Sequence, residues 1–199
     1  MGFINLQDLD DRMRSRNVDL NENFKKSIEN DFLNETRTFS ETSEFDIFLS
    51  HRKLDSPRIL ALKEKLEEDY GLTVYVDWIE DKQLSRKHVT KESAKHIRRR
   101  MSSCKTLVLA YSEDSQDSLW IPWELGYFDG LKQLVSIMPI FKSPTSEKSY
   151  DGQEYLGIYP YVTEQIDTSK KMQLWVNDGN PHKYISYNGW MTGKQPYDR

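Results

Sequence analysis

Four residues between positions 120 and 127 combine side-chain types that could carry chemistry. Trp120, Trp123, Glu124 and Tyr127 recur at spacings of three and four residues, so a helix would carry them on one face. Apolar walls change the pKa of a carboxyl group beside them, and indole rings offer a flat heterocycle a stacking surface. The same pattern also fits a core-facing helix whose glutamate is favoured by the helix dipole. From the spacing alone, both interpretations stand.

Short apolar segments around this group predict an α/β protein with a parallel sheet. Such segments are typical of strands that are buried on both faces. Five strands are expected, over residues 45–50, 72–77, 105–111, 134–140 and 173–176. Helices are expected between Ser56 and Gly71, over 89–103 and 120–132, and as a short element over 184–191. Strands that alternate with helices in this way indicate a sheet covered by helices on its faces.

The carboxyl ends of the expected strands are where a ligand would bind. In an open parallel sheet, ligands occupy the crevice at which the strand order reverses. A flavodoxin-like order, 2-1-3-4-5, puts that crevice between the first and third strands. The residues that leave the strands there are Ser50, His51, Arg52, Asp77, Trp78 and Ser112. The helix that begins at Trp120 starts at the same edge, which would bring Trp123 and Glu124 towards it.

Length and composition exclude several classes of protein. The chain has 199 residues, one cysteine and a formal net charge of −4. It shows no run of about 20 apolar residues that could span a membrane, no secretory signal and no Gly-rich phosphate loop. Cys104 alone allows neither a disulfide nor a multi-thiolate metal site, and His88 and His96 are poorly spaced for a metal. We expect a reduced, cytoplasmic protein without metal or membrane association.

One stretch of the chain is strongly basic. Residues 82–105 hold nine Lys or Arg and one acid, Glu92. Such a run either binds phosphate or nucleic acid, or forms the solvated face of a helix. No aromatic residue for base stacking is interleaved with these cations. The solvated face is therefore favoured, and no nucleic-acid partner is expected.

The two ends of the chain are less regular than its middle. Residues 1–44 are acidic and polar, and they are expected to form an N-terminal extension. Apolar residues at helical spacing over 21–33 predict an amphipathic helix, and the polar segment 34–44 is typical of a linker. The extension would be a cap on the domain, a disordered tail or an oligomerisation helix. Residues 153–161 fit no element, and the tail from Thr192 is expected to be loose.

Three blocks of sequence resemble motifs of Toll/interleukin-1 receptor (TIR) domains, above all bacterial ones. FDIFLSH at 45–51 resembles the opening strand, VYVD at 74–77 the second strand, and SLWIPWEL at 118–125 the S-x-W-x-x-x-E-L box of the third helix. The blocks stand in register over about residues 45–141, so the set is more specific than any one block. The resemblance implies a TIR domain over 45–199 with a five-stranded parallel sheet and helices on both faces.

The resemblance also implies an enzyme that consumes NAD⁺. Many TIR domains similar to this one cleave NAD⁺ at the nicotinamide–ribose bond, and the family's catalytic glutamate falls on Glu124. Trp120 would wall the nicotinamide end, Trp123 would shape the same pocket, and Arg52 could reach a phosphate. The rest of the site would be lined by Ser50, His51, Asp77, Trp78 and Ser112. NAD⁺ would be a substrate, so no cofactor is expected.

Partners and product follow from the same resemblance. Similar bacterial proteins act in Thoeris-type antiphage defence, which implies that a separate effector protein senses the product. That product would be ADP-ribose or a cyclised or conjugated form of it. TIR enzymes often gain activity on assembly, so a homo-oligomer is expected. The loop Trp78–Lys87 lacks the Pro and Gly that many TIR domains carry there, which puts the family's assembly contacts through this loop in doubt.

A non-enzymatic interaction module is the main alternative. A TIR scaffold would tolerate Glu124→Gln, whereas an enzyme would lose nearly all turnover. The presence of Trp120, Trp123 and Glu124 together favours the enzyme. A nucleoside deoxyribosyltransferase-like or phosphoacceptor protein on a similar fold is a third hypothesis. The phosphoacceptor is set aside because Tyr111 and Ser112 stand where its acceptor aspartate would lie.

Overall fold

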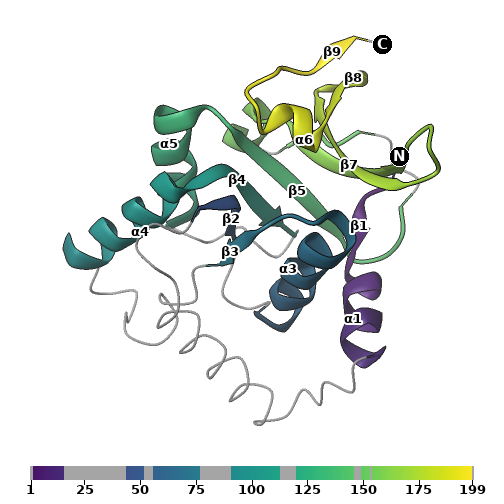
Figure 1. The fold of residues 1–199 in the computed structure, drawn as a ribbon, viewed down its shortest axis with the longest axis horizontal. Helices are drawn as coiled ribbons and strands as arrows, with labels where there is room; N and C mark the ends of the chain where they lie inside the picture. Colours follow the sequence, from purple (N-terminus) through teal and green to yellow (C-terminus); the bar gives the residue numbers. More distant parts are fainter. Residues whose placement is uncertain are drawn as a thin grey trace.

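A computed structural model describes residues 2–15, 44–51, 56–76, 91–112, 120–145, 149–152 and 154–198. Across these residues the centre of the molecule is one nine-stranded sheet with helices on both faces (Figure 1). The expected mixed α/β architecture, a central sheet covered by helices, is therefore confirmed. The expected total of five strands is wrong, because four more strands extend the sheet.

The central part of the sheet is parallel. Its strands are β2 (Phe45–Ser50), β3 (Val74–Val76), β4 (Cys104–Tyr111), β5 (Val135–Phe141) and β6 (Tyr161–Ile166). Neighbouring strands pair in parallel and run across the sheet in the order β3-β2-β4-β5-β6. The order reverses at β2, so the connections that leave β2 and β4 run to opposite sides of the sheet, and in open parallel sheets ligands bind at the carboxyl ends of the strands at such a reversal.

Antiparallel strands extend the sheet beyond β6. They are β7 (Met172–Asp178), β8 (Asn180–Ser186) and β9 (Tyr197–Asp198). β7 contains residues 173–176, the expected fifth parallel strand, but only a short turn separates it from β6. A strand joined by a short turn pairs antiparallel with its neighbour, because a parallel pair needs a long crossover. The fifth parallel strand is β6, and the 3₁₀ helix η3 (Glu154–Ile158) precedes it within the segment that fits no expected element.

The C-terminal end also differs from expectation. Only Tyr187–Trp190 of the expected helix over 184–191 is helical, as the short helix α6, because β8 continues to Ser186. The Ser186 side chain accepts a hydrogen bond from the Gly189 N–H and so caps the helix. The tail from Thr192 is tied back to the sheet, because β9 pairs with β8.

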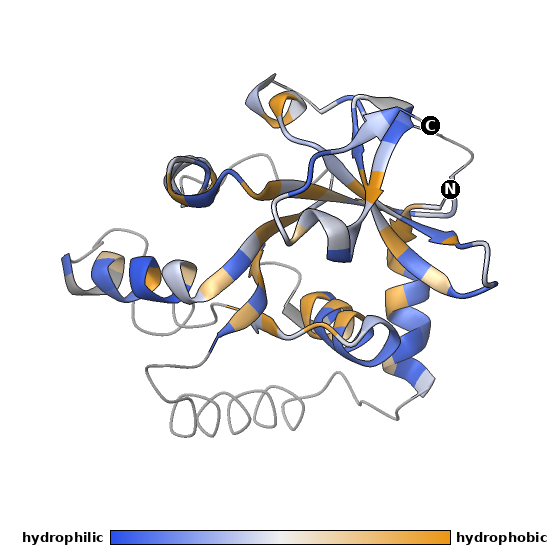
Figure 2. Cartoon of the chain, turned by 45° about the horizontal axis from the view of Figure 1, so that its top comes forward, coloured by the Kyte–Doolittle hydropathy of each residue, from blue (hydrophilic) through white to orange (hydrophobic). Residues whose placement is uncertain are grey.

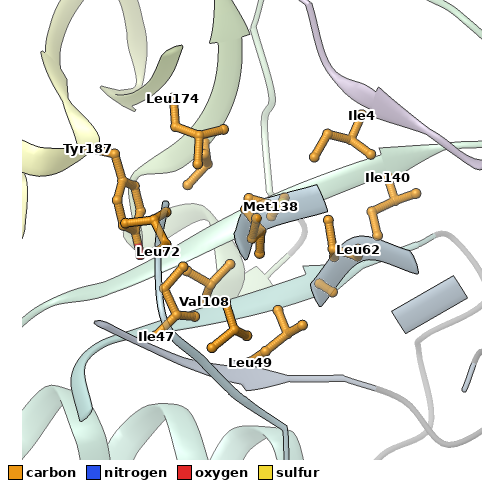
Figure 3. Close-up of a cluster of buried hydrophobic side chains, with 14 of the residues drawn as sticks. Ile4, Ile47, Leu49, Leu62, Leu72, Val108, Met138, Ile140, Leu174 and Tyr187 are labelled. Carbon is orange, nitrogen blue, oxygen red and sulfur yellow. The ribbon is translucent and has the colours of Figure 1, made fainter. Parts of the chain in front are cut away.

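Helices enclose two hydrophobic cores, one on each face of the sheet. The longer helices are α1 (Leu6–Ser15), α3 (Ser56–Tyr70), α4 (Lys91–Ser103) and α5 (Trp120–Lys132). Helices α1, α3 and α6 pack on the core that contains Ile47, Leu49 and Val108 (Figure 3). Helices α4 and α5 pack on the core that contains Phe48 and Leu109. Hydrophobic residues accordingly dominate the central strands in Figure 2, since alternate residues of a strand face opposite sides.

Helix α3 ends where the sequence predicts. Gly71 adopts a left-handed conformation, with φ of 68°. Its N–H donates to the Glu67 carbonyl over 3.0 Å, and the Leu72 N–H donates to the Leu66 carbonyl over 3.2 Å. These two bonds satisfy carbonyl groups that the helix end would otherwise leave unpaired. The chain then turns directly into β3.

The first described residues are part of the folded domain. β1 (Ile4–Asn5) pairs with β5 in parallel, and Leu9 of α1 is fully buried in the core on the α3 face. The expected helix over 21–33 and linker over 34–44 lie outside the described residues, so the boundary at residue 44 stays a prediction. No helix within the described ranges is long and apolar enough to cross a membrane.

Candidate active site

The carboxylate of Glu124 and the hydroxyl of Ser50 are in direct contact. Ser50 Oγ donates a hydrogen bond to Glu124 Oε2 over 2.5 Å, although 74 positions separate the two residues in the sequence. Only 2% of Ser50 and 5% of Glu124 is exposed. A hydrogen bond to a charged acceptor is shorter and stronger than one between neutral groups. This hydrogen bond therefore helps to fix the direction in which the carboxylate points.

Strand alternation and helix position bring these two side chains together. Ile47 and Leu49 of β2 face the α3 side, so Phe48 and Ser50 face the side of α4 and α5. Ser50 is the last residue of β2 and lies at the carboxyl edge of the sheet. Helix α5 covers the same face, and its second turn carries Glu124 to the end of β2.

Two more of the expected residues lie at the same edge. Ser112 is buried directly after β4, which pairs with β2 so that Leu109 stands opposite Ser50. His51 is half-buried directly after β2, and its Nδ1 lies 3.4 Å from the Leu49 carbonyl oxygen. Nδ1 can donate to that oxygen only in the tautomer that carries its proton there. The structure thus places a serine and a histidine at the same edge of the sheet as the Ser50–Glu124 pair, at the ends of two paired strands.

The expected aromatic face of α5 is present where the structure describes it. The rings of Trp123 and Tyr127 stack with their centroids 5.8 Å apart and an interplanar angle of 22°. Both side chains are half-buried against the core under α4 and α5. The spacing of four residues correctly predicts that these two rings share a face.

The structure describes neither Arg52, Asp77 nor Trp78, and it describes Trp120 only as the position at which α5 begins. Their contributions to the site stay predictions. So do the assembly contacts of the loop Trp78–Lys87, which lies outside the described residues as well.

A series of tyrosine rings adjoins this edge, and no pattern in the sequence predicts their contacts. Tyr111 ends β4, and its ring meets that of Tyr150 edge-on with centroids 6.2 Å apart. Tyr150 meets Tyr161 of β6 at the same distance. Burial raises the pKa of Tyr150, and the neighbouring Tyr111 adds to the effect, so the phenol stays protonated. Tyr150 lies in a segment without strand or helix periodicity, so no sequence pattern points to it.

The part of the chain that the structure describes offers little for metal binding or for thiol chemistry. It contains no group of three or more His, Cys, Asp or Glu side chains that could hold a metal ion. Cys104 is free and buried at the start of β4, away from the carboxyl edge. Burial raises the pKa of its thiol to about 12, so it is not a thiolate at neutral pH. Among the described residues at that edge, Glu124 is the acid placed to stabilise a positive charge.

These features define a class: an α/β protein with a buried carboxylate, held by a strand-end serine, at the carboxyl edge of a parallel sheet. Known proteins then identify the family. The chain is 49% identical over 156 residues, which is 78% of its own length and 79% of the relative's, to "Probable 3' cyclic ADP-D-ribose synthase ThsB'" of Bacillus cereus (strain MSX-D12). At this identity and coverage, the chain belongs to the bacterial TIR-domain family that includes ThsB', as its motifs indicate.

A more distant relative covers less of the chain. "Putative cyclic ADP-D-ribose synthase TIR2" of Cytobacillus dafuensis is 26% identical over 84 residues, which is 42% of this chain and 22% of that protein. No protein-family model matches the sequence.

Proposed function

We propose that this chain cleaves NAD⁺ between nicotinamide and ribose and closes the ADP-ribosyl group into a cyclic ADP-ribose, a nucleotide signal of antiphage defence. The observation that carries the proposal is the buried hydrogen bond from Ser50 to Glu124 at the carboxyl edge of the sheet. The identity to a relative named as a 3' cyclic ADP-D-ribose synthase supports the choice of substrate and product.

The chemistry needs one well-placed carboxylate. The C–N bond between ribose and the positively charged nicotinamide ring breaks, and both electrons of that bond leave with neutral nicotinamide. The ribosyl carbon is left with oxocarbenium character, as in glycoside cleavage, and the Glu124 carboxylate stabilises that charge. A hydroxyl oxygen of the same ADP-ribosyl group then bonds to the carbon and loses its proton. Because the leaving group needs no proton, a general acid is not required.

The other residues of the edge would bind NAD⁺ around this centre. The proposed lining is His51, Arg52, Asp77, Trp78, Ser112, Trp120 and Trp123. Trp120 and Trp123 would hold the nicotinamide end, and Arg52 would pair with a phosphate. NAD⁺ is the substrate in this scheme, and no further cofactor takes part.

The proposal extends to the whole chain. The functional unit is a flavodoxin-like TIR domain, residues 45–199, whose five parallel strands carry the site and whose antiparallel strands extend it. Residues 1–44 form an N-terminal extension of that unit, and its described part, residues 2–15, packs into the same fold through β1 and α1. Assembly into a homo-oligomer, a cytoplasmic location and a separate effector protein that senses the product belong to the same proposal.

Mass spectrometry of reaction products tests this function. Purified wild-type protein, Glu124→Gln and the control Asp198→Asn are incubated with NAD⁺, alone and with lysate from phage-infected cells. We expect nicotinamide and a cyclic ADP-ribose from the wild type and the control, and a loss of at least a hundredfold with Glu124→Gln. The control removes one carboxylate from exposed β9, away from the site.

The result also separates the enzyme from a TIR scaffold. No nicotinamide from wild type under either condition, or equal turnover by Glu124→Gln, would leave only the interaction module. Nicotinamide with linear ADP-ribose would keep the cleavage step and reject the cyclisation.

A further inference from the structure

The basic helix α4 borders a hollow that the proposed reaction does not use. The hollow has a volume of about 860 Å³, which lies within the range of small-ligand sites. Its described lining consists of Glu44, Lys95, His96, Arg98, Arg99, Arg100, Ser102, Ser103 and Tyr127. Four of these side chains carry a permanent positive charge, and one carboxylate stands among them.

The arrangement of α4 differs from a simple solvated helix face. Ile97 and Met101 are buried against the sheet, as an amphipathic helix requires. The cations on the remaining surface of the helix do not all project separately into solvent, because they line one concave surface together with Tyr127 of α5. The sequence alone favours a solvated helix face. The spacing of polar residues shows which face of the helix is polar, but it does not show whether that face borders a concave surface.

Two side chains of the hollow, His96 and Arg100, have features that favour the binding of an anion. His96 is half-buried, and its Nε2 has no hydrogen-bond partner among the described residues. A buried polar atom without a partner is costly, and an anionic oxygen would accept a hydrogen bond from Nε2 in the tautomer that carries the proton there. The Arg100 guanidinium lies 5.4 Å from the centre of the Tyr75 ring. This contact restricts the arginine before any ligand arrives.

The hollow lies at the opposite edge of the sheet from Glu124. Glu44 directly precedes β2, and Ser103 directly precedes β4, so both mark the amino edge. Ser50 ends β2 at the carboxyl edge. Six residues of extended chain rise about 20 Å, at about 3.3 Å each, which separates Glu44 from Ser50. A ligand in the hollow would therefore be distinct from one bound at the Ser50–Glu124 pair.

We propose that this hollow is a second ligand site, which takes a small anion with two or more phosphate groups. Guanidinium groups pair with phosphate oxygens through two parallel hydrogen bonds, and three arginines on one hollow can hold more than one phosphate. A concave site of this volume fits a small molecule. Duplex nucleic acid instead needs an extended basic surface, and the chain as a whole carries a net charge of −4. The Glu44 carboxylate would face hydroxyl or amino groups of the ligand.

Calorimetric titration of the full chain with sodium tripolyphosphate tests the site. We expect saturable one-to-one binding to the wild type and to Glu124→Gln, weaker at 200 mM than at 50 mM salt because salt screens the charges. The double variant Arg98→Gln/Arg99→Gln should bind at least tenfold more weakly. Both arginines are exposed, so the variant should fold, and its thermal midpoint is checked. The control Lys171→Gln/Lys194→Gln removes the same charge elsewhere and should stay within twofold of wild type.

Four results would overturn the proposal. They are non-saturable binding to wild type, an equal loss in the lysine control, tighter binding of a 20-base-pair duplex through the same arginines, and a rise in KM for NAD⁺ that matches the loss of tripolyphosphate affinity. The last result would assign the hollow to the substrate. The binding measurements need no catalytic activity, so they stand or fall independently of the proposed NAD⁺ cleavage.

Discussion

Ser50 acts on Glu124 as a positioning residue, and its removal should affect the chemical step more than binding. Its hydroxyl donates to the carboxylate that would stabilise the transition state. Ser50→Ala removes this donor, and a hydrogen bond to a charged group contributes about 1.5–3 kcal/mol. We expect kcat to fall about 10- to 100-fold with KM nearly unchanged, as measured by steady-state release of nicotinamide.

Ser136 provides a matched control for that substitution. It is fully buried on β5, and its Oγ has no hydrogen-bond partner among the described residues. Ser136→Ala therefore makes the same chemical change in a buried strand without removing a described hydrogen bond, and kcat should stay within twofold of wild type. Equal losses in the two variants would show that Ser50 supports the fold and not the carboxylate.

The residues of the site were predictable to different degrees. Glu124 and Ser50 stand in recognisable motifs, and the expected strand edge places both near one crevice. The hydrogen bond between them could not be predicted, because it depends on how α5 is rotated where it packs on β4 and β5. Tyr150 gives no signal, since it packs against Tyr111 from a loop whose path only the folded chain determines.

At the scale of elements, α1 should contribute to stability as an integral helix. Leu9 is fully buried in the core on the α3 face, so Leu9→Ala leaves a cavity there. Leucine-to-alanine changes in cores cost about 2–5 kcal/mol, and urea unfolding should show a loss in that range. The control Leu131→Ala on α5, where the leucine is 45% exposed, should lose less than about 1 kcal/mol. If Leu9→Ala lowered the free energy of unfolding as little as the control does, α1 would not be an integral part of the folded domain.

Elements with both a clear pattern and clear end signals were predicted well. Helix α3 has an apolar stripe and Gly71 at its end, and the structure reproduces both. β7 shows the limit of such patterns, because a short apolar strand looks the same whether it pairs parallel or antiparallel. The turn between β6 and β7 decides the direction, and residues 153–161 carried no signal that would reveal the parallel strand that follows them.

At the scale of the whole molecule, the site depends on the completed sheet. Ser50 and Glu124 meet only when β2 pairs with β4 and α5 packs on the face they share. Cys104, the one cysteine of the chain, begins β4 and lies in the core beneath α4 and α5. Its exposure to solvent therefore reports whether the assembly that holds the site is intact.

Thiol labelling can measure this integrity. Burial raises the pKa of Cys104 to about 12, so at pH 8 about one thiol in 10⁴ is ionised, against about a quarter at the ordinary pKa of about 8.5. Because the thiolate is the reactive form, native protein should react with a water-soluble disulfide reagent at least a thousandfold more slowly than protein unfolded in urea. A Leu131→Cys variant supplies an exposed thiol on α5 as the fast control. Labelling of Cys104 at the control's rate in native protein would mean that the start of β4 and the core beneath α4 and α5 open readily.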